Sequence, residues 1–127
     1  MHAPASFDYA ILRVVPRVER QEFMNAGVLV FCLEKRFLAA RIRLDRNRLQ
    51  ALWPDVDEDL VRRHLDAVER ICAGDPTGGP IAQLPLRERF HWLVSPRSTI
   101  IQPSPVHTGL CDGTDDLLDR LERQFLS

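Results

Sequence analysis

The segment between residues 95 and 109 gathers polar residue types that can bind an anion. Among its side chains are one cation, two neighbouring hydroxyls, an amide and an imidazole: Arg97, Ser98, Thr99, Gln102 and His107. A guanidinium can donate two parallel hydrogen bonds to a phosphate or carboxylate, and a histidine can exchange protons near neutral pH. Two interpretations stay open. The segment is either a ligand site with His107 as acid–base catalyst, or a set of ordinary turns, in which serine, threonine, proline and glycine are the usual residues.

A second polar cluster lies closer to the N-terminus and consists of Arg13, Arg20, Glu22 and Asn25. Arg13 interrupts one face of an otherwise apolar strand, and a half-buried arginine needs a partner. Glu19 or Glu22 could supply that partner in an ion pair that fixes the following loop. The alternative is that the cluster binds an anion or another ligand. The structural interpretation is the commoner one, because an arginine beside a glutamate is more often neutralised than left to bind a ligand.

No established chemical motif supports either cluster. The chain has neither of the glycine-rich phosphate motifs G-x-x-x-x-G-K-[ST] and G-x-G-x-x-G, and it lacks the nucleophile motif G-x-S-x-G. Its four histidines do not have the spacing of metal ligands, and its three cysteines include no C-x-x-C pair. We therefore expect no metal and no cofactor. The sequence does not decide whether the protein is an enzyme.

Length and composition indicate a single domain over residues 1–127. A chain of this mass buries about two-thirds of its unfolded surface, which is enough for one core. With 45% hydrophobic residues it is not a disordered chain, and no apolar run approaches the roughly 18 residues of a membrane span. The net charge of −1 argues against general attraction to nucleic acid or to a membrane surface. The N-terminus lacks the cationic start of a signal peptide, so we expect a cytoplasmic protein.

Hydrophobic periodicity predicts most strands in the first third of the chain. Alternating or continuous apolar residues predict strands over residues 7–15, 28–33 and 37–44, the second of them buried on both faces. Phe90, Trp92 and Val94 occupy every second position and would share one face, which predicts a further strand over residues 88–94. Residues 99–102 are expected to form a short edge strand, because two prolines follow it.

Helices are predicted after the first strands and at the end of the chain. Aspartates that can cap a helix open segments 45–52 and 57–73, and the longer one carries an apolar stripe at helical spacing. Residues 106–113 are expected to be irregular, and Thr114 is expected to cap a last helix. This order favours an α+β fold: an antiparallel sheet of about four or five strands with helices packed on one face.

Two stretches of the sequence resemble one family. The first reads Y-x-I-L-R-x-V-P over residues 9–16 and R-Q-E-F-M-N-A-G-V over residues 20–28. The second runs from S-P-R-S-T at residues 95–99 through Gln102 to H-T-G at residues 107–109. Both are similar to signatures of an uncharacterised bacterial family of short proteins, domain-of-unknown-function family 3037. The resemblance implies a cytosolic bacterial protein without an established activity. It also implies a protein partner, since some members are encoded beside kinase-like proteins of the toxin–antitoxin type.

Two functional hypotheses follow. The first is a non-enzymatic accessory module that binds a partner protein of the kinase-like type, through an apolar edge or face left unpaired in the monomer. The second is an enzyme or sensor for a phosphate-bearing or nucleotide ligand, with Arg13, Arg20 and Arg97 as anion clamps and His107 as the acid–base group. Nucleic acid and membranes are not expected partners. Because both polar clusters coincide with the family's signatures, we expect them to meet at one end of the sheet.

Overall fold

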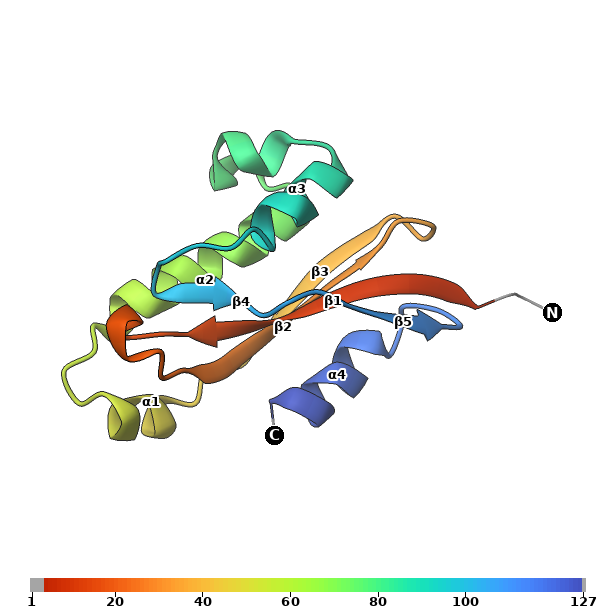
Figure 1. The fold of residues 1–127 in the computed structure, drawn as a ribbon. Coiled ribbons are helices and arrows are strands. Elements are labelled where there is room, and N and C mark those ends of the chain that lie inside the picture. The colour runs from red at the N-terminus through yellow and green to blue at the C-terminus, as the bar shows by residue number, and fades with distance from the viewer. Residues whose placement is uncertain (1–3, 127) are drawn as a thin grey trace.

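One antiparallel sheet of five strands runs through residues 4–126, the part of the chain that this computed structural model describes (Figure 1). In chain order the strands are β1 (Ala5–Val14), β2 (Met24–Cys32), β3 (Phe37–Ile42), β4 (Ile101–Pro103) and β5 (His107–Cys111). Strands β3, β2, β1 and β4 lie side by side in that order, and β5 also pairs with β1. Strands β1 and β2 are therefore the interior strands, and β1 pairs with three of the other strands.

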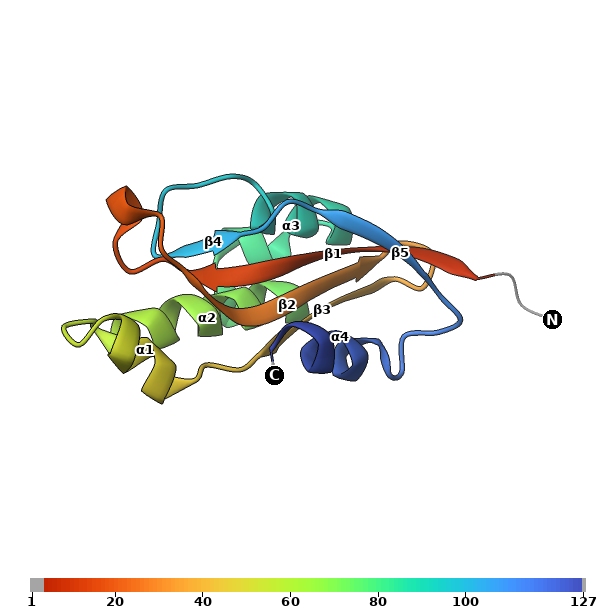
Figure 2. The same cartoon turned by 60° about the horizontal axis from the view of Figure 1, so that its bottom comes forward.

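Strands β4 and β5 follow one another along the same edge of β1 (Figure 2). They are separated at Ser104, which stands between two prolines and is buried. The backbone N–H of Ile11 donates to the Ser104 hydroxyl at 2.8 Å, and the Ser104 N–H donates to the Ile11 carbonyl at 2.8 Å. Because prolines cannot donate to a sheet, this serine keeps the edge attached where the backbone ladder is interrupted.

Four α-helices accompany the sheet over residues 4–126: α1 (Arg46–Leu52), α2 (Glu58–Ala73), α3 (Leu86–Leu93) and α4 (Leu117–Phe125). The Asp45 and Asp57 carboxylates cap α1 and α2 by accepting backbone N–H groups of Arg48 and Leu60, at 3.0 and 3.1 Å. Helix α2 ends at Gly74, whose φ of +67° suits a residue without a side chain. None of the helices in this part of the chain is both long enough and apolar enough to cross a membrane.

The sheet has helices on both faces, because alternate side chains of each strand enter different cores. Leu29 and Phe31 of β2 pack with residues of α2 and α3. Val28 and Val30 point the other way and pack with Leu117 of α4. Figure 1 shows α2 and α3 on one side of the sheet and α4 on the other. The α+β class and the antiparallel sheet are confirmed. The expectation that all helices pack on one face is wrong, because α4 packs on the face opposite α2 and α3. The apolar stripe of α4 could pack on either face of the sheet, so the sequence does not choose between them.

Residues 88–94, which we expected to form a strand, lie mostly in helix α3. The buried residues are Phe90 and Leu93, three positions apart on one side of the helix. The Phe90 ring stacks on Phe31, with 4.8 Å between the ring centroids. Trp92, the alternate neighbour of Phe90, is 39% exposed. Over so short a run the apolar residues fit both periodicities, and packing against β2 selects the helix.

Residues 107–111, which we expected to be irregular, form strand β5 and pair with residues 5–9 of β1. Most side chains of β5 are exposed, so the strand lacks the apolar alternation that would reveal it. Helix α4 begins at Leu117 without a side-chain cap. Thr114, the expected cap, instead accepts the Leu117 N–H through its backbone carbonyl, at 3.4 Å.

The packing of α4 on the sheet can be tested at Leu121, a buried residue of that helix that is 4% exposed. Leu121→Ala should lower the free energy of unfolding by about 2–4 kcal/mol, because it leaves a cavity between α4 and the sheet. Leu110→Ala is the matched control, since Leu110 is 66% exposed, and it should change that free energy by less than about 0.5 kcal/mol. Urea denaturation measures both variants, and equal effects would contradict the packing.

Candidate functional site

Three strands bring polar residues of the two sequence clusters into one row near an end of the sheet. Arg13 of β1 lies opposite Asn25 of β2 along one edge and opposite Gln102 of β4 along the other. Directly opposed residues of antiparallel strands point to the same face. The register of β1 and β2 shifts between Leu12 and Arg13, an irregularity of the kind that redirects a side chain. The expected meeting of the clusters therefore occurs at these three positions.

Beside this row lies a hollow of about 300 Å³, which we call the Arg13 hollow. Its lining comes from both clusters and from the turn before β2: Arg13, Val15, Val18, Gln21, Phe23, Ser98 and Gln102. Both views of the fold show the turn before β2 and the loop before β4 at the same end of the sheet (Figures 1 and 2). Gln21 has a φ of 56°, an uncommon backbone conformation for a residue with a side chain.

The guanidinium of Arg13 borders this hollow without a counter-charge. Its Cζ atom lies 4.3 Å from the ring centroid of Phe23, a cation–π contact. Its Nε atom is buried without a hydrogen-bond partner, and within residues 4–126 no carboxylate forms an ion pair with it. The interpretation that Glu19 or Glu22 neutralises Arg13 is therefore wrong. A cation–π contact offsets only part of the cost of removing a charge from water, so an anion could still bind here.

Arg20, Glu22 and Asn25 make structural contacts instead of lining the Arg13 hollow. Arg20, the last residue of the short 3-10 helix η1 (Val18–Arg20), forms an exposed ion pair of 2.9 Å with Glu22. The Asn25 side chain donates to the backbone carbonyl of Phe125 at 3.3 Å, which fastens the end of α4 to the sheet. Of the four residues of the N-terminal cluster, only Arg13 lines this hollow.

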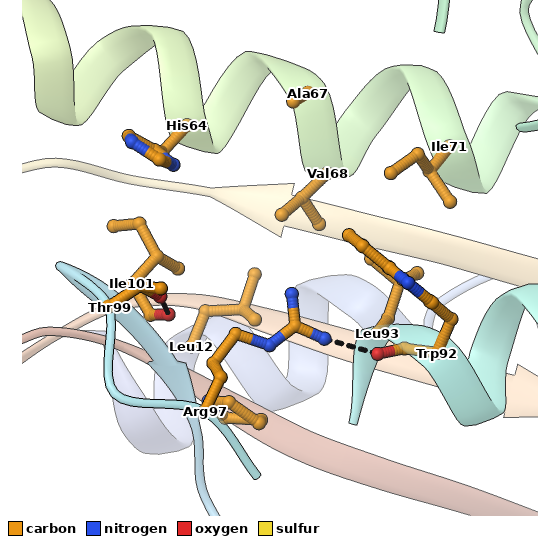
Figure 3. A pocket seen from close by; sticks show the side chains of 11 residues that line it. Leu12, His64, Ala67, Val68, Ile71, Trp92, Leu93, Arg97, Thr99 and Ile101 are labelled. Carbon is orange, nitrogen blue, oxygen red and sulfur yellow. Dashed lines mark hydrogen bonds between the residues drawn. The ribbon is translucent and has the colours of Figure 1, made fainter. Parts of the chain in front are cut away.

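A second hollow, of about 80 Å³, lies on the opposite face between α2, α3 and β4, and we call it the Arg97 hollow (Figure 3). Arg97 stacks on the Trp92 ring, with 4.3 Å from Cζ to the ring centroid. Its guanidinium donates to the backbone carbonyls of Trp92 and Ser95. The Thr99 hydroxyl, also at this hollow, donates to the Ile101 carbonyl at 2.7 Å. Burial lowers the pKa of Arg97 below its usual value.

The loop that joins α3 to β4 contributes lining residues to both hollows. Ser98 lines the Arg13 hollow, whereas Arg97 and Thr99 line the Arg97 hollow. The Gln102 amide donates to the Thr99 carbonyl at 3.0 Å, which fixes the end of this loop. The three arginines expected to act together as anion clamps thus occupy separate places: Arg13 on one face, Arg97 on the other, and Arg20 in an ion pair.

His107, the expected acid–base group, lines neither of these two hollows. It is exposed on β5 opposite Tyr9, with 5.4 Å between the ring centroids. Tyr9 precedes Arg13 by four residues on the same strand, a separation of about 13 Å. This distance is too large for His107 to exchange a proton with a ligand held directly by Arg13. Within residues 4–126, no group of histidine, cysteine and acidic side chains is arranged to hold a metal.

Sequence reasoning did not identify the two aromatic residues on which the arginines stack. Phe23 is 47% exposed beside Arg13, and its place within the first signature was the available signal. Trp92 lies in helix α3 and not in a strand, and the end of this helix brings its ring to Arg97. His64 of α2 is exposed and also lies at the Arg97 hollow.

The absence of a structural partner for Arg13 leads to a stability prediction. Arg13→Met should change the free energy of unfolding by less than about 1 kcal/mol, because no ion pair or hydrogen bond is lost. Arg89→Met is the contrasting variant. Its guanidinium donates to the carbonyls of Leu84, Ile71 and Cys72 at 2.8–2.9 Å, so its loss should cost about 2–4 kcal/mol. Urea denaturation compares the two, and an equally large loss at Arg13 would make that residue structural.

The comparisons with known proteins give one match. The family described as "Protein of unknown function (DUF3037)" matches residues 9–126. No curated protein and no solved structure matches the chain. The matched range includes both polar clusters, both hollows and every helix of the fold. The chain therefore belongs to the DUF3037 family.

Proposed function

We propose that this protein is a non-enzymatic accessory module that binds a partner protein at the Arg13 hollow. The observation that supports the proposal is the state of Arg13, whose charge has no carboxylate partner within residues 4–126 and lies over the half-exposed ring of Phe23. Arginine and aromatic residues are enriched among those that dominate the binding energy of protein interfaces. The partner chemistry that fits is an acidic side chain flanked by apolar residues.

The surroundings of Arg13 support this partner chemistry. Phe23 and Val18 are exposed large hydrophobic residues at 47% and 37%, and both line the hollow. Contact with a partner would remove the apolar surface of both residues from water, and the acidic side chain of the partner would neutralise Arg13. The Ser98 hydroxyl and Gln102 amide can donate further hydrogen bonds to a carboxylate.

The finer form of the proposal is a cytoplasmic bacterial protein with a kinase-like partner of the toxin–antitoxin type. The partner type rests on the family resemblance alone. One observation supports a cytoplasmic location: Cys32, Cys72 and Cys111 are buried free thiols. Burial raises the pKa of Cys72 to about 12, so this thiol stays protonated at neutral pH. Unpaired thiols are typical of proteins in reducing compartments.

The second candidate function is an enzyme or sensor for a phosphate-bearing or nucleotide ligand. It is favoured by the same unpaired Arg13 guanidinium, together with the hydroxyl of Ser98 and the amide of Gln102. The positions of the other expected residues weigh against it. Arg20 is engaged by Glu22, Arg97 lies on the opposite face, and His107 lines neither hollow. Without a placed acid–base group, binding is better supported than catalysis.

The test is co-purification from native lysate with the tagged wild-type protein and surface variants. Phe23→Ser and Arg13→Gln should each reduce the stoichiometric recovery of the partner by tenfold or more, because central interface residues of these types carry most of the binding energy. Leu110→Ser is the matched control, since this 66% exposed leucine lies on β5, which pairs with the opposite end of β1. It should retain the partner fully.

Two outcomes would contradict the proposal. If Phe23→Ser recovers the same amount of partner as the wild type, the Arg13 hollow is not the interface. If nucleotides or sugar phosphates raise the melting temperature by several degrees and Arg13→Gln abolishes that shift, the ligand function replaces the module. Circular dichroism of each variant confirms that the fold is retained.

A further inference from the structure

The Arg97 hollow combines an apolar interior with one cation. Most of its lining is aliphatic or aromatic and comes from α2, α3 and the strands β1 and β4: Leu12, Ala67, Val68, Ile71, Trp92, Leu93, Ile101 and Pro103. The polar side chains are His64, Thr99 and Arg97, and the Thr99 hydroxyl already donates to the Ile101 carbonyl. Figure 3 shows the Arg97 guanidinium extending under the Trp92 ring toward Val68 and Leu93.

The hydrogen bonds of Arg97 leave one of its nitrogens without an acceptor. Nε donates to the Ser95 carbonyl at 3.2 Å, and Nη2 donates to the Trp92 carbonyl. Nη1 donates to nothing in the described part of the chain and points into the hollow toward Val68 (Figure 3). The two acceptors of the Arg97 guanidinium are neutral carbonyls, whereas the guanidinium of Arg41 donates to the carboxylates of Asp119 and Glu122. A guanidinium facing an apolar space needs a negative charge that can enter that space.

We propose that the Arg97 hollow binds a small organic carboxylate, with its carboxylate on Arg97 and its short aliphatic body among the apolar residues. The volume of about 80 Å³ sets the size of that body. Pockets for drug-sized ligands measure roughly 300–1,000 Å³, so this hollow admits only a small aliphatic group. An isopropyl or propyl group has this size. The Trp92 ring holds the guanidinium in place by stacking, which reduces the ordering cost of binding.

An inorganic phosphate fits this hollow less well than a carboxylate with an apolar body. A phosphate needs several donors to replace its hydration, and Arg97 offers one free nitrogen here. It would also leave the aliphatic lining exposed to water. The body of an organic acid removes that apolar surface from water while the carboxylate accepts the Arg97 hydrogen bond. This site does not depend on the proposed partner interface, because the two hollows lie on opposite faces and share no residue.

The experiment is a titration of the full chain with sodium isobutyrate, followed by the indole N–H signals of its two tryptophans in ¹H–¹⁵N spectra. The Trp92 signal should move in a saturable way, with a dissociation constant on the order of millimolar, as expected for so small a ligand. The buried Trp53 is the internal control and should not move. Isobutyramide, which has the same shape without the charge, should bind at least tenfold more weakly.

Variants assign the binding to the named residues. Arg97→Gln should weaken isobutyrate binding at least tenfold, and the matched Arg43→Gln, at an arginine that pairs with Glu122 of α4, should leave it unchanged. Ala67→Leu fills the hollow from the exposed side of α2 and should abolish binding. It also keeps the test decisive if Arg97→Gln fails to fold.

Several results would overturn the proposal. Equal affinities for isobutyrate and isobutyramide would show that the negative charge does not contribute to binding. An equal Trp92 shift with inorganic phosphate would show that the apolar body does not contribute. Unchanged binding by Ala67→Leu would place the ligand elsewhere. A peptide ending in valine carries a carboxylate beside the same isopropyl group. Binding of such a peptide at least tenfold tighter than isobutyrate would assign the site to a chain terminus in place of a free acid.

Discussion

The central position of β1 is the constraint on which the rest of the structure depends. This strand is hydrogen-bonded to β2 along one edge and to β4 and β5 along the other. Its neighbours on the two edges come from opposite ends of the chain, so the two sequence signatures become spatial neighbours through it. Leu12 lies on the face with α2 and α3, whereas Arg13, the next residue of the strand, lies on the other face. Leu12 therefore lines the Arg97 hollow, and Arg13 lines the Arg13 hollow on the opposite face.

Six arginines of this protein fall into two groups with different physical roles. Arg41 and Arg43 pair with carboxylates of α4, Arg20 pairs with Glu22, and Arg89 donates to carbonyls at the end of α2. The last arrangement is favourable because the carbonyl end of a helix attracts positive charge. These contacts hold elements together.

Arg13 and Arg97 belong to the second group, because each stacks on an aromatic ring at 4.3 Å and pairs with no carboxylate within residues 4–126. Stacking fixes the position of a guanidinium without neutralising it. Each charge therefore stays available to an anion and is held ready in one geometry. We therefore propose Arg13 and Arg97 as the binding arginines of this fold, and both lie in the segments that resemble the family's signatures.

Local patterns in the sequence determined the elements whose stability is local. The cap and apolar stripe of α2, the cap of α1 and the apolar runs of β1, β2 and β3 identify these elements correctly, because capping and periodicity act over a few residues. Tertiary structure alone decided the rest. Helix α3 is selected by the contact of Phe90 with Phe31, and the exposed strand β5 exists only because β1 supplies its hydrogen bonds across about a hundred residues of chain. The face covered by α4, the unpaired state of Arg13 and the separation of Arg97 from it likewise depend on long-range packing, which residue types and spacing do not encode.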